Sequence, residues 1–573
     1  MQAYPNTIRM TKTPKIDEFL SKQRRGAEER AAKRRAEKHN LEYLDLVSVK
    51  TPTEIKAMEL VKEEDAREAL LVPVKLAGKK LMIAAYDPER QETKKILDDL
   101  KENYKVKVAV TSKSGLKQTW SYYQYVKEEG KEITGSVNID PEEIKKLNEK
   151  INTLQDFSLT VKNFENPRIS QLLETFLGGA IALQASDIHL EPAEEASTFR
   201  IRIDGMLHAI SKEISEKTHK SLVTRIKLLS NLKLNVHDTP QDGRFTINLP
   251  ERDIEIRTSV IPSEYGETIV LRLLDPKALK INLEELGWRK DDLEIIKKEV
   301  DRPNGLILNT GPTGSGKTTT LYAFLRRKVK PEIKIITIED PIEYHIEGIS
   351  QTQVDKEAGY NFSNGLRSIL RQDPDVILVG EIRDRETTDI ALNASLTGHM
   401  VFSTLHTNHA VGAIPRLLDL GAKPNILAPA VSLIIAQRLV RKLCDKCKKS
   451  AEVSGEGKEE INEFLEGLPK RVDKEEYKDF QIYKADPEGC DACNHTGYKG
   501  RTSIFEIIPV TDKIEEKIYE NPTEIELREL AKEQGTVFMQ EDGVLKVLEG
   551  ITDFQEVERL TGPIEWIKDT LKK

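Results

Sequence analysis

Gly311-Pro-Thr-Gly-Ser-Gly-Lys317-Thr318 matches the phosphate-loop pattern GxxxxGK[ST] at every required position. It follows the apolar run Leu306-Ile-Leu308 and precedes a helix-like continuation, which predicts a strand, a tight loop and a helix. Glycines let backbone N–H groups turn inward around phosphate oxygens, and the helix N-terminus adds positive potential. An empty glycine-rich turn is the alternative, and the complete spacing argues against it. The nucleotide-binding residues expected in this loop are Gly311, Pro312, Thr313, Gly314, Ser315, Gly316, Lys317, Thr318 and Thr319.

Two side chains of this phosphate loop have distinct chemical tasks. Lys317 is expected to reach the β- and γ-phosphates of a nucleotide, and the hydroxyl of Thr318 to bind Mg²⁺. The sequence therefore predicts ATP and Mg²⁺ as ligands.

Composition limits the class of protein. The chain has 573 residues and a formal net charge of −8 at pH 7. This length suggests about three or four domains, and the acidic balance argues against nucleic-acid binding. No apolar run approaches the ~18 residues needed to cross a bilayer, and the first twenty residues lack the apolar core of a signal peptide. We expect a cytoplasmic protein whose membrane association, if any, is peripheral.

The first half of the chain predicts two α/β modules joined by a linker. Residues 1–40 are expected to form a charged helix or tail exposed to solvent, since the stretch from Ser21 onward has no apolar side chain larger than alanine. Contact with anionic lipid or a partner is the alternative, but it would need an apolar face. Residues 41–125 predict a compact α/β domain, residues 126–151 a mobile linker, and residues 152–282 a second α/β module.

Arginines recur on the predicted strands of the second module. Alternation in Phe199-Arg-Ile-Arg-Ile-Asp204 places Arg200 and Arg202 on one face of a strand. Arg257 and Arg272 lie on later strands. Each one alone fits a surface ion pair. As a set on one side of a sheet, they could hold nucleotide phosphates across a domain or subunit boundary.

Strand-like runs recur after the phosphate loop at βαβ spacing, and each ends in polar residues. Parallel strands present such residues at the carboxyl edge of a sheet. Carboxylates there can hold Mg²⁺ and orient a water molecule for attack on a γ-phosphate. Histidines there could contact phosphate, although each alone also fits a hydrogen-bonded structural residue. The polar residues in question are Glu339, Asp340, Glu343, Glu381, His399 and His406.

All four cysteines lie in one late stretch and form two C-x-x-C hooks, Cys444 with Cys447 and Cys490 with Cys493. Four thiolates at tetrahedral positions make a closed structural Zn²⁺ site, which suits a reducing compartment. Reduced, buried cysteines without metal are the alternative. The long stretch between the hooks requires an insertion that loops out and returns.

Together these motifs resemble the secretion ATPases that drive type II secretion and type IV pilus assembly. Residues 338–343 are similar to the acidic box of that family, residues 370–381 to its Walker B segment and residues 398–408 to its histidine box. The resemblance covers about residues 165–510. Further similar stretches are Ser186–Pro192, Pro240–Arg244 and Gln437–Arg441.

The resemblance implies a multidomain α/β fold and a homohexameric ring. Its RecA-like P-loop ATPase core would span residues 283–573, with the zinc-binding element at 444–493 and a helical C-terminal tail that includes a helix near 524–533. A PAS-like module at 152–282 and an N-terminal docking domain would precede this core. The neighbouring module would supply arginines, Glu343 would polarise the attacking water, and Glu381 would support Mg²⁺ and its waters.

The function that this resemblance implies is a Mg²⁺-dependent ATPase motor that acts on an inner-membrane platform. The tetracysteine element and the N-terminal domain are similar to the assembly and secretion branch, which favours pilus extension or type II secretion over pilus retraction. A DNA-uptake system fits equally well. The N-terminal domain would bind a docking partner, and we predict no cyclic-di-GMP site because an Arg-Leu-Gly repeat is missing.

Two rivals belong to other classes. A DNA-translocating or helicase-type ATPase would need DNA-stimulated hydrolysis, and the acidic charge argues against it. A scaffold that binds ATP without turnover would not need Lys317, Glu343 and Glu381 together.

Overall fold

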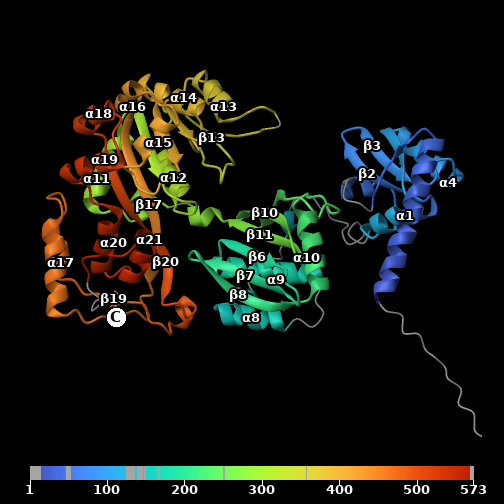
Figure 1. The fold of residues 1–573 in the computed structure, drawn as a ribbon, viewed down its shortest axis with the longest axis horizontal. Coiled ribbons are helices and arrows are strands. Elements are labelled where there is room, and N and C mark those ends of the chain that lie inside the picture. Colours follow the sequence, from blue (N-terminus) through green and yellow to red (C-terminus); the bar gives the residue numbers. More distant parts are fainter. Residues whose placement is uncertain are drawn as a thin grey trace, which may run out of the picture. The chain divides into compact units, whose positions relative to one another are not determined.

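The structure is a computed structural model whose residues fall into two compact units, Met1–Leu273 and Leu274–Lys573. Figure 1 shows the helices and strands of each unit. No helix in the part of the chain that the structure describes is long and apolar enough to cross a membrane. The described residues are 14–46, 53–123, 136–138, 146–147, 150–163, 168–249, 252–279, 281–356 and 358–567.

The first unit begins with a small four-stranded sheet in the order β1-β4-β3-β2. Its strands β2 and β3 form an antiparallel hairpin, while β4 runs parallel to both β1 and β3. Helices pack on this sheet and bury Leu71, Ile83 and Leu116 completely. The elements are β1 (Glu42–Tyr43), α2 (Ile55–Met58), α3 (Glu63–Glu68), β2 (Leu71–Ala77), β3 (Lys80–Ala85), α4 (Gln91–Lys101), β4 (Lys105–Val110) and α5 (Lys113–Trp120).

The charged N-terminal helix, α1 (Pro14–Lys38), packs against this sheet through its second half. Ala32 and Ala36 are buried, because their small side chains allow the helix to approach closely. Ser112 Oγ donates to Glu29 Oε1 at 2.6 Å, and the Arg35 guanidinium lies 3.8 Å from the centre of the Tyr86 ring. The second half of this helix is therefore partly packed, whereas the sequence predicted full solvation.

The second sheet of the first unit has seven strands in the order β5-β9-β10-β11-β6-β7-β8. Helices cover one of its faces, and Phe176 stacks on Phe199 with ring centroids 3.9 Å apart. Residues 136–138 of the predicted linker form β5, and most of the remaining linker lies outside the described residues. The elements are β5 (Ser136–Asn138), α8 (Leu154–Lys162), α9 (Ile169–Ala182), β6 (Asp187–Glu191), β7 (Ser197–Ile203), β8 (Met206–Ile214), α10 (Glu216–Leu229), β9 (Gln241–Asn248), β10 (Asp253–Ser263) and β11 (Gly266–Leu274).

The second unit is built on another seven-stranded sheet, in the order β14-β13-β15-β16-β12-β17-β20. All neighbours are parallel except β17 and β20, which form an antiparallel pair. Every residue of β12, β13, β15 and β16 is buried, as expected of a parallel sheet covered on both faces. The strands are β12 (Gly305–Thr310), β13 (Ile335–Glu339), β14 (Ser350–Gln353), β15 (Val376–Val379), β16 (Met400–Leu405), β17 (Val431–Leu443) and β20 (Tyr498–Pro509).

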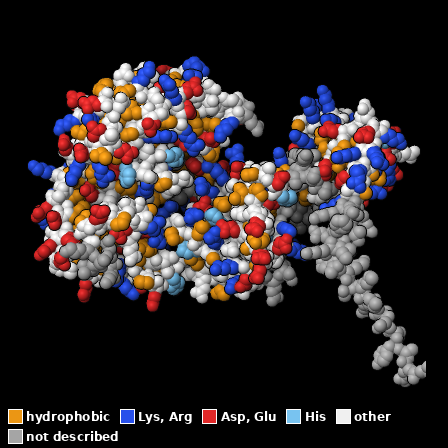
Figure 2. Space-filling model, in the orientation of Figure 1, with side chains coloured by type: hydrophobic (Ala, Val, Ile, Leu, Met, Phe, Trp, Pro, Cys, Tyr) orange, Lys and Arg blue, Asp and Glu red, His pale blue; other side chains and the backbone are white. Residues whose placement is uncertain are grey.

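Helices lie on both faces of this sheet, and the C-terminal tail is helical, as predicted (Figure 1). The predicted helix near 524–533 is α19. Acidic and basic side chains are interspersed over the visible face of this unit (Figure 2). The helices are α11 (Lys290–Asp301), α12 (Lys317–Lys328), α13 (Phe362–Leu370), α14 (Arg385–Leu396), α15 (Ala413–Asp419), α16 (Pro424–Ala430), α17 (Gly455–Gly467), α18 (Asp512–Ile518), α19 (Glu524–Glu533), α20 (Met539–Leu548) and α21 (Phe554–Thr561).

The tetracysteine segment and the C-terminal tail pack together. The insertion between the two cysteine hooks carries α17, and its Phe464 stacks on Trp566 with ring centroids 4.9 Å apart. Apolar residues of the insertion and of α20 and α21 form one hydrophobic cluster. The multidomain α/β fold predicted from the sequence is confirmed, and the insertion leaves the first cysteine hook and returns at the second.

Candidate active site

The phosphate loop, residues 311–318, connects the end of β12 to the start of α12. Gly311 and Gly316 have φ values of +149° and +92°, a backbone region that favours glycine. A Cβ at Gly311 would lie 2.6 Å from the Gln437 carbonyl oxygen, and one at Gly316 would lie 2.8 Å from Gln437 Nε2. Both glycines are therefore needed for backbone conformation and for the close approach of β17.

Lys317 is the first residue of α12, and its ammonium group lies over the phosphate loop. Nζ donates to the carbonyl oxygens of Gly311, at 2.7 Å, and Pro312, at 3.0 Å. Burial, and then the positive charge of Arg438, lowers the pKa of Lys317 to about 8, while Glu381 opposes the shift. Phosphate oxygens are stronger acceptors for an ammonium group than peptide carbonyls. A bound phosphate can therefore replace these carbonyl oxygens as the hydrogen-bond acceptor of Lys317.

Glu339 ends strand β13 and is buried. It accepts hydrogen bonds from Tyr322 OH on α12, from Thr337 Oγ1 at 2.6 Å and from Gln351 Nε2 at 3.2 Å. Burial and the nearby Glu339 raise the pKa of Tyr322, so its phenol stays protonated and donates. The sequence placed Glu339 among the carboxylates that could hold Mg²⁺ or a water molecule at the nucleotide site. In the structure its carboxylate connects α12 to β13 and β14.

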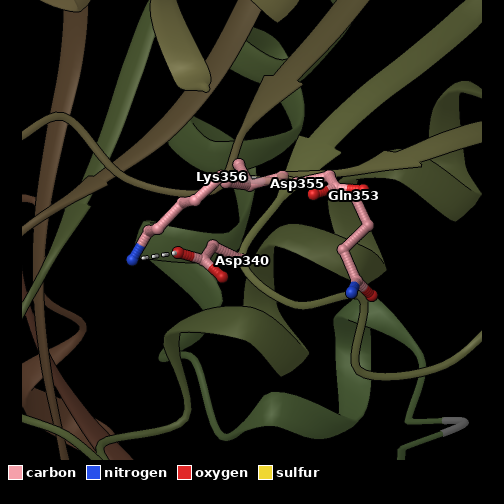
Figure 3. A pocket seen from close by; sticks show the side chains of 5 residues that line it. Asp340, Gln353, Asp355 and Lys356 are labelled. Atoms are coloured by element: carbon pink, nitrogen blue, oxygen red, sulfur yellow. Dashed lines mark ion pairs between the residues drawn. The ribbon is translucent and has the colours of Figure 1, made fainter. Parts of the chain in front are cut away.

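Asp340 follows Glu339 and lines a pocket together with Gln353, Val354, Asp355 and Lys356. Figure 3 shows Lys356 extending toward Asp340, with Nζ 3.8 Å from Oδ2. The residues come from the ends of the parallel strands β13 and β14, so the pocket lies at the carboxyl edge of the sheet. Glu343 follows in the same segment and is half-buried.

Glu381 and His406 meet at the same edge, next to the phosphate loop. Glu381 follows β15 and His406 follows β16, and β16 lies between β15 and β12 in the sheet. Glu381 Oε2 is 3.3 Å from His406 Nε2 and also pairs with Arg383. The structure thus brings together Lys317, Glu381 and His406, as predicted for strands that end in polar residues.

His399 does not join this group. It precedes β16, and because β12 and β16 are parallel, it lies at the amino edge of the sheet. Its Nδ1 lies 2.9 Å from the carbonyl oxygen of Ala394, at the end of α14. A residue that precedes a strand and a residue that follows it lie at opposite edges of the sheet. The sequence analysis did not make this distinction between His399 and His406.

The four predicted arginines of the first unit lie on the face of its seven-stranded sheet opposite the buried one. On β7, Phe199 and Ile201 are buried, whereas Arg200 and Arg202 are partly exposed. Each arginine has an acidic neighbour, which fits the ion-pair alternative as well as a phosphate clamp. The pairs are Arg200 with Glu191, Arg202 with Asp187 at 3.3 Å, Arg272 with Asp187 at 3.1 Å and Arg257 with Glu255 at 3.5 Å.

The four cysteine sulfurs form one cluster, all within 4.8 Å of one another. The Sγ atoms of Cys444 and Cys490 are 3.8 Å apart, and those of Cys447 and Cys493 are 3.7 Å apart. Thiolates around a tetrahedral ion with bonds of about 2.3 Å would lie about 3.8 Å from one another, so the spacing fits a tetrahedral metal ion.

Backbone N–H groups also surround one of these sulfurs. The N–H groups of Cys490 and Gly497 donate to Cys493 Sγ at 3.2 and 3.3 Å. Burial alone would raise its pKa, but these N–H groups lower the pKa of Cys493 to about 7. Metal ligation needs the deprotonated thiolate.

The sequence analysis did not predict a role for Gln437, a residue of β17 that contacts the elements around the phosphate loop. Gln437 Oε1 accepts from Asn309 Nδ2 at 3.0 Å and from Thr320 Oγ1 at 2.9 Å, and its Nε2 donates to Ser503 Oγ at 3.0 Å. It therefore ties β12, α12 and β20 together. A polar residue inside an apolar strand was the available signal, and it was noted only as part of a resemblance.

Comparisons with known proteins cover both halves of the chain. A family model described as "Type II/IV secretion system protein" matches residues 163–559, and one described as "MshEN domain" matches residues 39–130. Type II secretion system protein E of Pseudomonas aeruginosa is 44% identical over 399 residues, which are 69% of this chain and 75% of that protein.

Two further comparisons bear on the same region. The type IV pilus assembly ATPase PilB of Myxococcus xanthus is 37% identical over 512 residues, 88% of this chain and 87% of that protein. The X-ray structure of the Legionella pneumophila ATPase DotB aligns with a TM-score of 0.50 at 20% identity, over 70% of this chain and 98% of that one. The second of these shows a shared fold.

Proposed function

The chain belongs to the type II/IV secretion system protein family and is an ATPase of that family, and we propose that it is the hexameric motor of a filament-building machine. In this role it hydrolyses MgATP at an inner-membrane platform to extend a type IV pilus or to assemble the pseudopilus of a type II secretion system. The observation that carries this proposal is the carboxyl edge of the second unit, where a complete phosphate loop, Glu381 and His406 lie together.

Nucleotide and Mg²⁺ fit the donor set at this edge. Thr318 offers a hydroxyl at the start of α12 and Glu381 a carboxylate, and hard oxygen ligands of this kind suit Mg²⁺. Bound Mg²⁺ would neutralise charge on the β- and γ-phosphates. Lys317 would hold the same phosphates, and Glu343 would orient the water that attacks the γ-phosphate. His406, paired with Glu381, would contact the γ-phosphate side of the site.

A neighbouring subunit would complete the site with arginines from its own first unit. Support comes from their common sheet face and partial exposure. In the single chain their charges are held by carboxylates, and phosphate binding would exchange one acidic partner for another. The residues are Arg200, Arg202, Arg257 and Arg272.

We further propose Zn²⁺ at Cys444, Cys447, Cys490 and Cys493 as a structural ion. Support comes from the tetrahedral sulfur spacing and the N–H donors on Cys493. Purified protein should contain about one zinc per chain by elemental analysis, and Cys490→Ser should remove it and lower the melting temperature. Zinc at full occupancy in that variant would contradict the assignment.

The N-terminal domain would dock the motor on a cytoplasmic or membrane-associated partner. Support comes from the match of residues 39–130 to a separate domain model. In this role the protein would lie in the cytoplasm, peripheral at the inner membrane. A pull-down of the platform and docking proteins with and without residues 1–125 tests this location.

The central experiment is steady-state ATP hydrolysis by the purified chain with Mg²⁺, with its mass measured by light scattering. Activity confined to a hexamer and lost in Lys317→Ala and Glu343→Gln is the expected result. Activity of a monomer would overturn the ring. Hydrolysis that appears only when DNA is added would favour a DNA-translocating ATPase instead.

A further inference from the structure

Arg438 lies beside the phosphate loop because β17 continues past the end of β12. Thr310, the last residue of β12, pairs with Ala436, so Gln437 and Arg438 extend along the loop itself. A Cβ at Gly311 would lie 3.3 Å from Arg438 Nη1. The guanidinium is therefore in contact range of the first residue of the loop.

The two terminal nitrogens of Arg438 have different surroundings. Nη2 donates to the backbone oxygen of Asn408 at 3.3 Å and to Asn408 Oδ1 at 3.2 Å. Nη1 is buried and has no hydrogen-bond partner among the described residues. The hydroxyl of Ser315, which is near the same point of Gly311, is also buried and without a partner there. A buried N–H of a charged group without an acceptor is rare and costly, so an acceptor from outside the chain is expected.

The charges around Arg438 indicate what that acceptor is. Arg438 lies close enough to Lys317 to lower its pKa, so two cations act on one loop. The carboxylate that attracts Arg438 is that of Glu506. It is buried and already accepts a hydrogen bond from the backbone N–H of Ala410 at 2.8 Å. A phosphate at the loop would relieve the repulsion between Lys317 and Arg438 and offer oxygens to both.

We propose that Arg438 is a nucleotide-binding residue contributed by the same subunit: Nη1 donates to a phosphate oxygen of the nucleotide, while Nη2 remains on Asn408. This role rests on the proposed function, because it needs a nucleotide in the phosphate loop. Asn408 belongs to the loop 406–410, here called the His406 loop. Arg438 thereby connects the phosphates to the His406 loop within one chain.

The alternative is that Arg438 only holds the His406 loop in place. Asn408→Ala separates the two roles, since it removes the side-chain acceptor of Nη2 and leaves Nη1 unchanged. If Arg438 acts only through the loop, Asn408→Ala should reproduce part of the loss seen in Arg438→Ala, since only the backbone oxygen of Asn408 then still accepts from Nη2. If it binds phosphate, only the arginine variant should lose nucleotide affinity.

The test measures dissociation constants for MgADP with a fluorescent ADP analogue, and kcat for ATP, on the full chain. Arg438→Ala should weaken ADP binding by about tenfold or more, as expected for a hydrogen bond between charged groups. Arg438→Lys should recover part of this loss, Asn408→Ala should stay within twofold of wild type, and so should Arg416→Ala, which removes an exposed arginine of α15.

An ADP affinity within twofold of wild type in Arg438→Ala would overturn the inference, as would a loss of more than twofold in Asn408→Ala. Melting temperatures check that the variants fold. If Arg438→Ala does not fold, the ADP affinity of Arg438→Gln is measured instead, and a value within twofold of wild type would again overturn the inference. A different result would contradict the proposed function itself. In that case the wild-type chain would not hydrolyse MgATP, or Lys317→Ala would hydrolyse it at the wild-type rate.

Discussion

The two seven-stranded sheets of this chain expose their functional groups in different ways. The sheet of the first unit is mainly antiparallel, and it buries one face while the other carries charged side chains. The sheet of the second unit is mainly parallel and buried on both faces, so polar groups collect at its carboxyl edge. Charged side chains therefore lie on a face in one sheet and at an edge in the other.

This difference predicts where substitutions act. A residue at the edge of the parallel sheet follows a rigid, buried strand, so its replacement should change catalysis more than folding. A charged residue on the open face of the antiparallel sheet is solvated, so its replacement should change the free energy of unfolding little.

The largest effect is expected for Glu343→Gln, which keeps the shape of the side chain but removes its basicity. The kcat for ATP should fall by about 10³-fold, within the range of a lost general base. Nucleotide affinity should stay within a few-fold. Measurement of phosphate release and of ADP binding checks both, with Glu347→Gln, an exposed neighbour, as the control. Unchanged hydrolysis in Glu343→Gln would show that Glu343 does not act in the reaction.

Lys317→Ala should lower kcat by about 10²-fold, because a positioned charge on the transferred phosphate is lost. Nucleotide affinity should fall as well, which distinguishes this variant from Glu343→Gln. Lys330→Ala, an exposed lysine after α12, is the matched control. Wild-type affinity in Lys317→Ala would mean that the phosphate loop is not where nucleotide binds.

Much of this edge could be predicted from the sequence, because local patterns determine it. The phosphate loop lies between a strand and a helix, and apolar strands precede Glu381 and His406, as the local sequence pattern predicts. Glu339 and His399 show the limit. Whether a carboxylate points to a ligand or to a buried tyrosine depends on packing between distant elements, and so does the edge at which a histidine lies.

The N-terminal helix and Gln437 show the same limit through contacts that the sequence analysis did not predict. Burial of Ala32 and Ala36 depends on a sheet formed far along the chain, and the hydrogen bonds of Gln437 join three separate elements. No spacing rule in the sequence reports such contacts.

Tyr322→Phe should destabilise the second unit by about 2 kcal/mol, because a buried carboxylate, Glu339, loses one of its donors. Chemical denaturation measures this change. Tyr360→Phe removes a half-buried hydroxyl that bonds Thr352 Oγ1 at 3.0 Å, and it should cost less. A loss below 0.5 kcal/mol in Tyr322→Phe, estimated on the same scale, would show that Glu339 does not depend on α12.

Nucleotide affinity should depend on pH through Lys317. In the free protein its pKa is about 8, and a bound phosphate favours the charged form. Above pH 8 binding must therefore take up a proton, and the dissociation constant for ADP should rise by about tenfold per pH unit. Below pH 8 Lys317 is already charged and this dependence should vanish. Titration calorimetry from pH 7 to 9.5 checks it, and Lys317→Arg, which stays charged, should abolish the rise.

The smallest effect is expected on the open face of the antiparallel sheet. Glu191→Gln removes the acidic partner of Arg200, and the two side chains are 30% and 35% exposed. Water replaces the lost partner at such exposure, so the free energy of unfolding should fall by less than about 1 kcal/mol. Denaturation of the isolated chain measures this directly. A loss well above that value would mean that Arg200 is not solvated when its partner is removed. The contrast between an open face and a chemical edge would then fail, and Arg200 would be part of the folded core instead of a charge available to a neighbouring subunit.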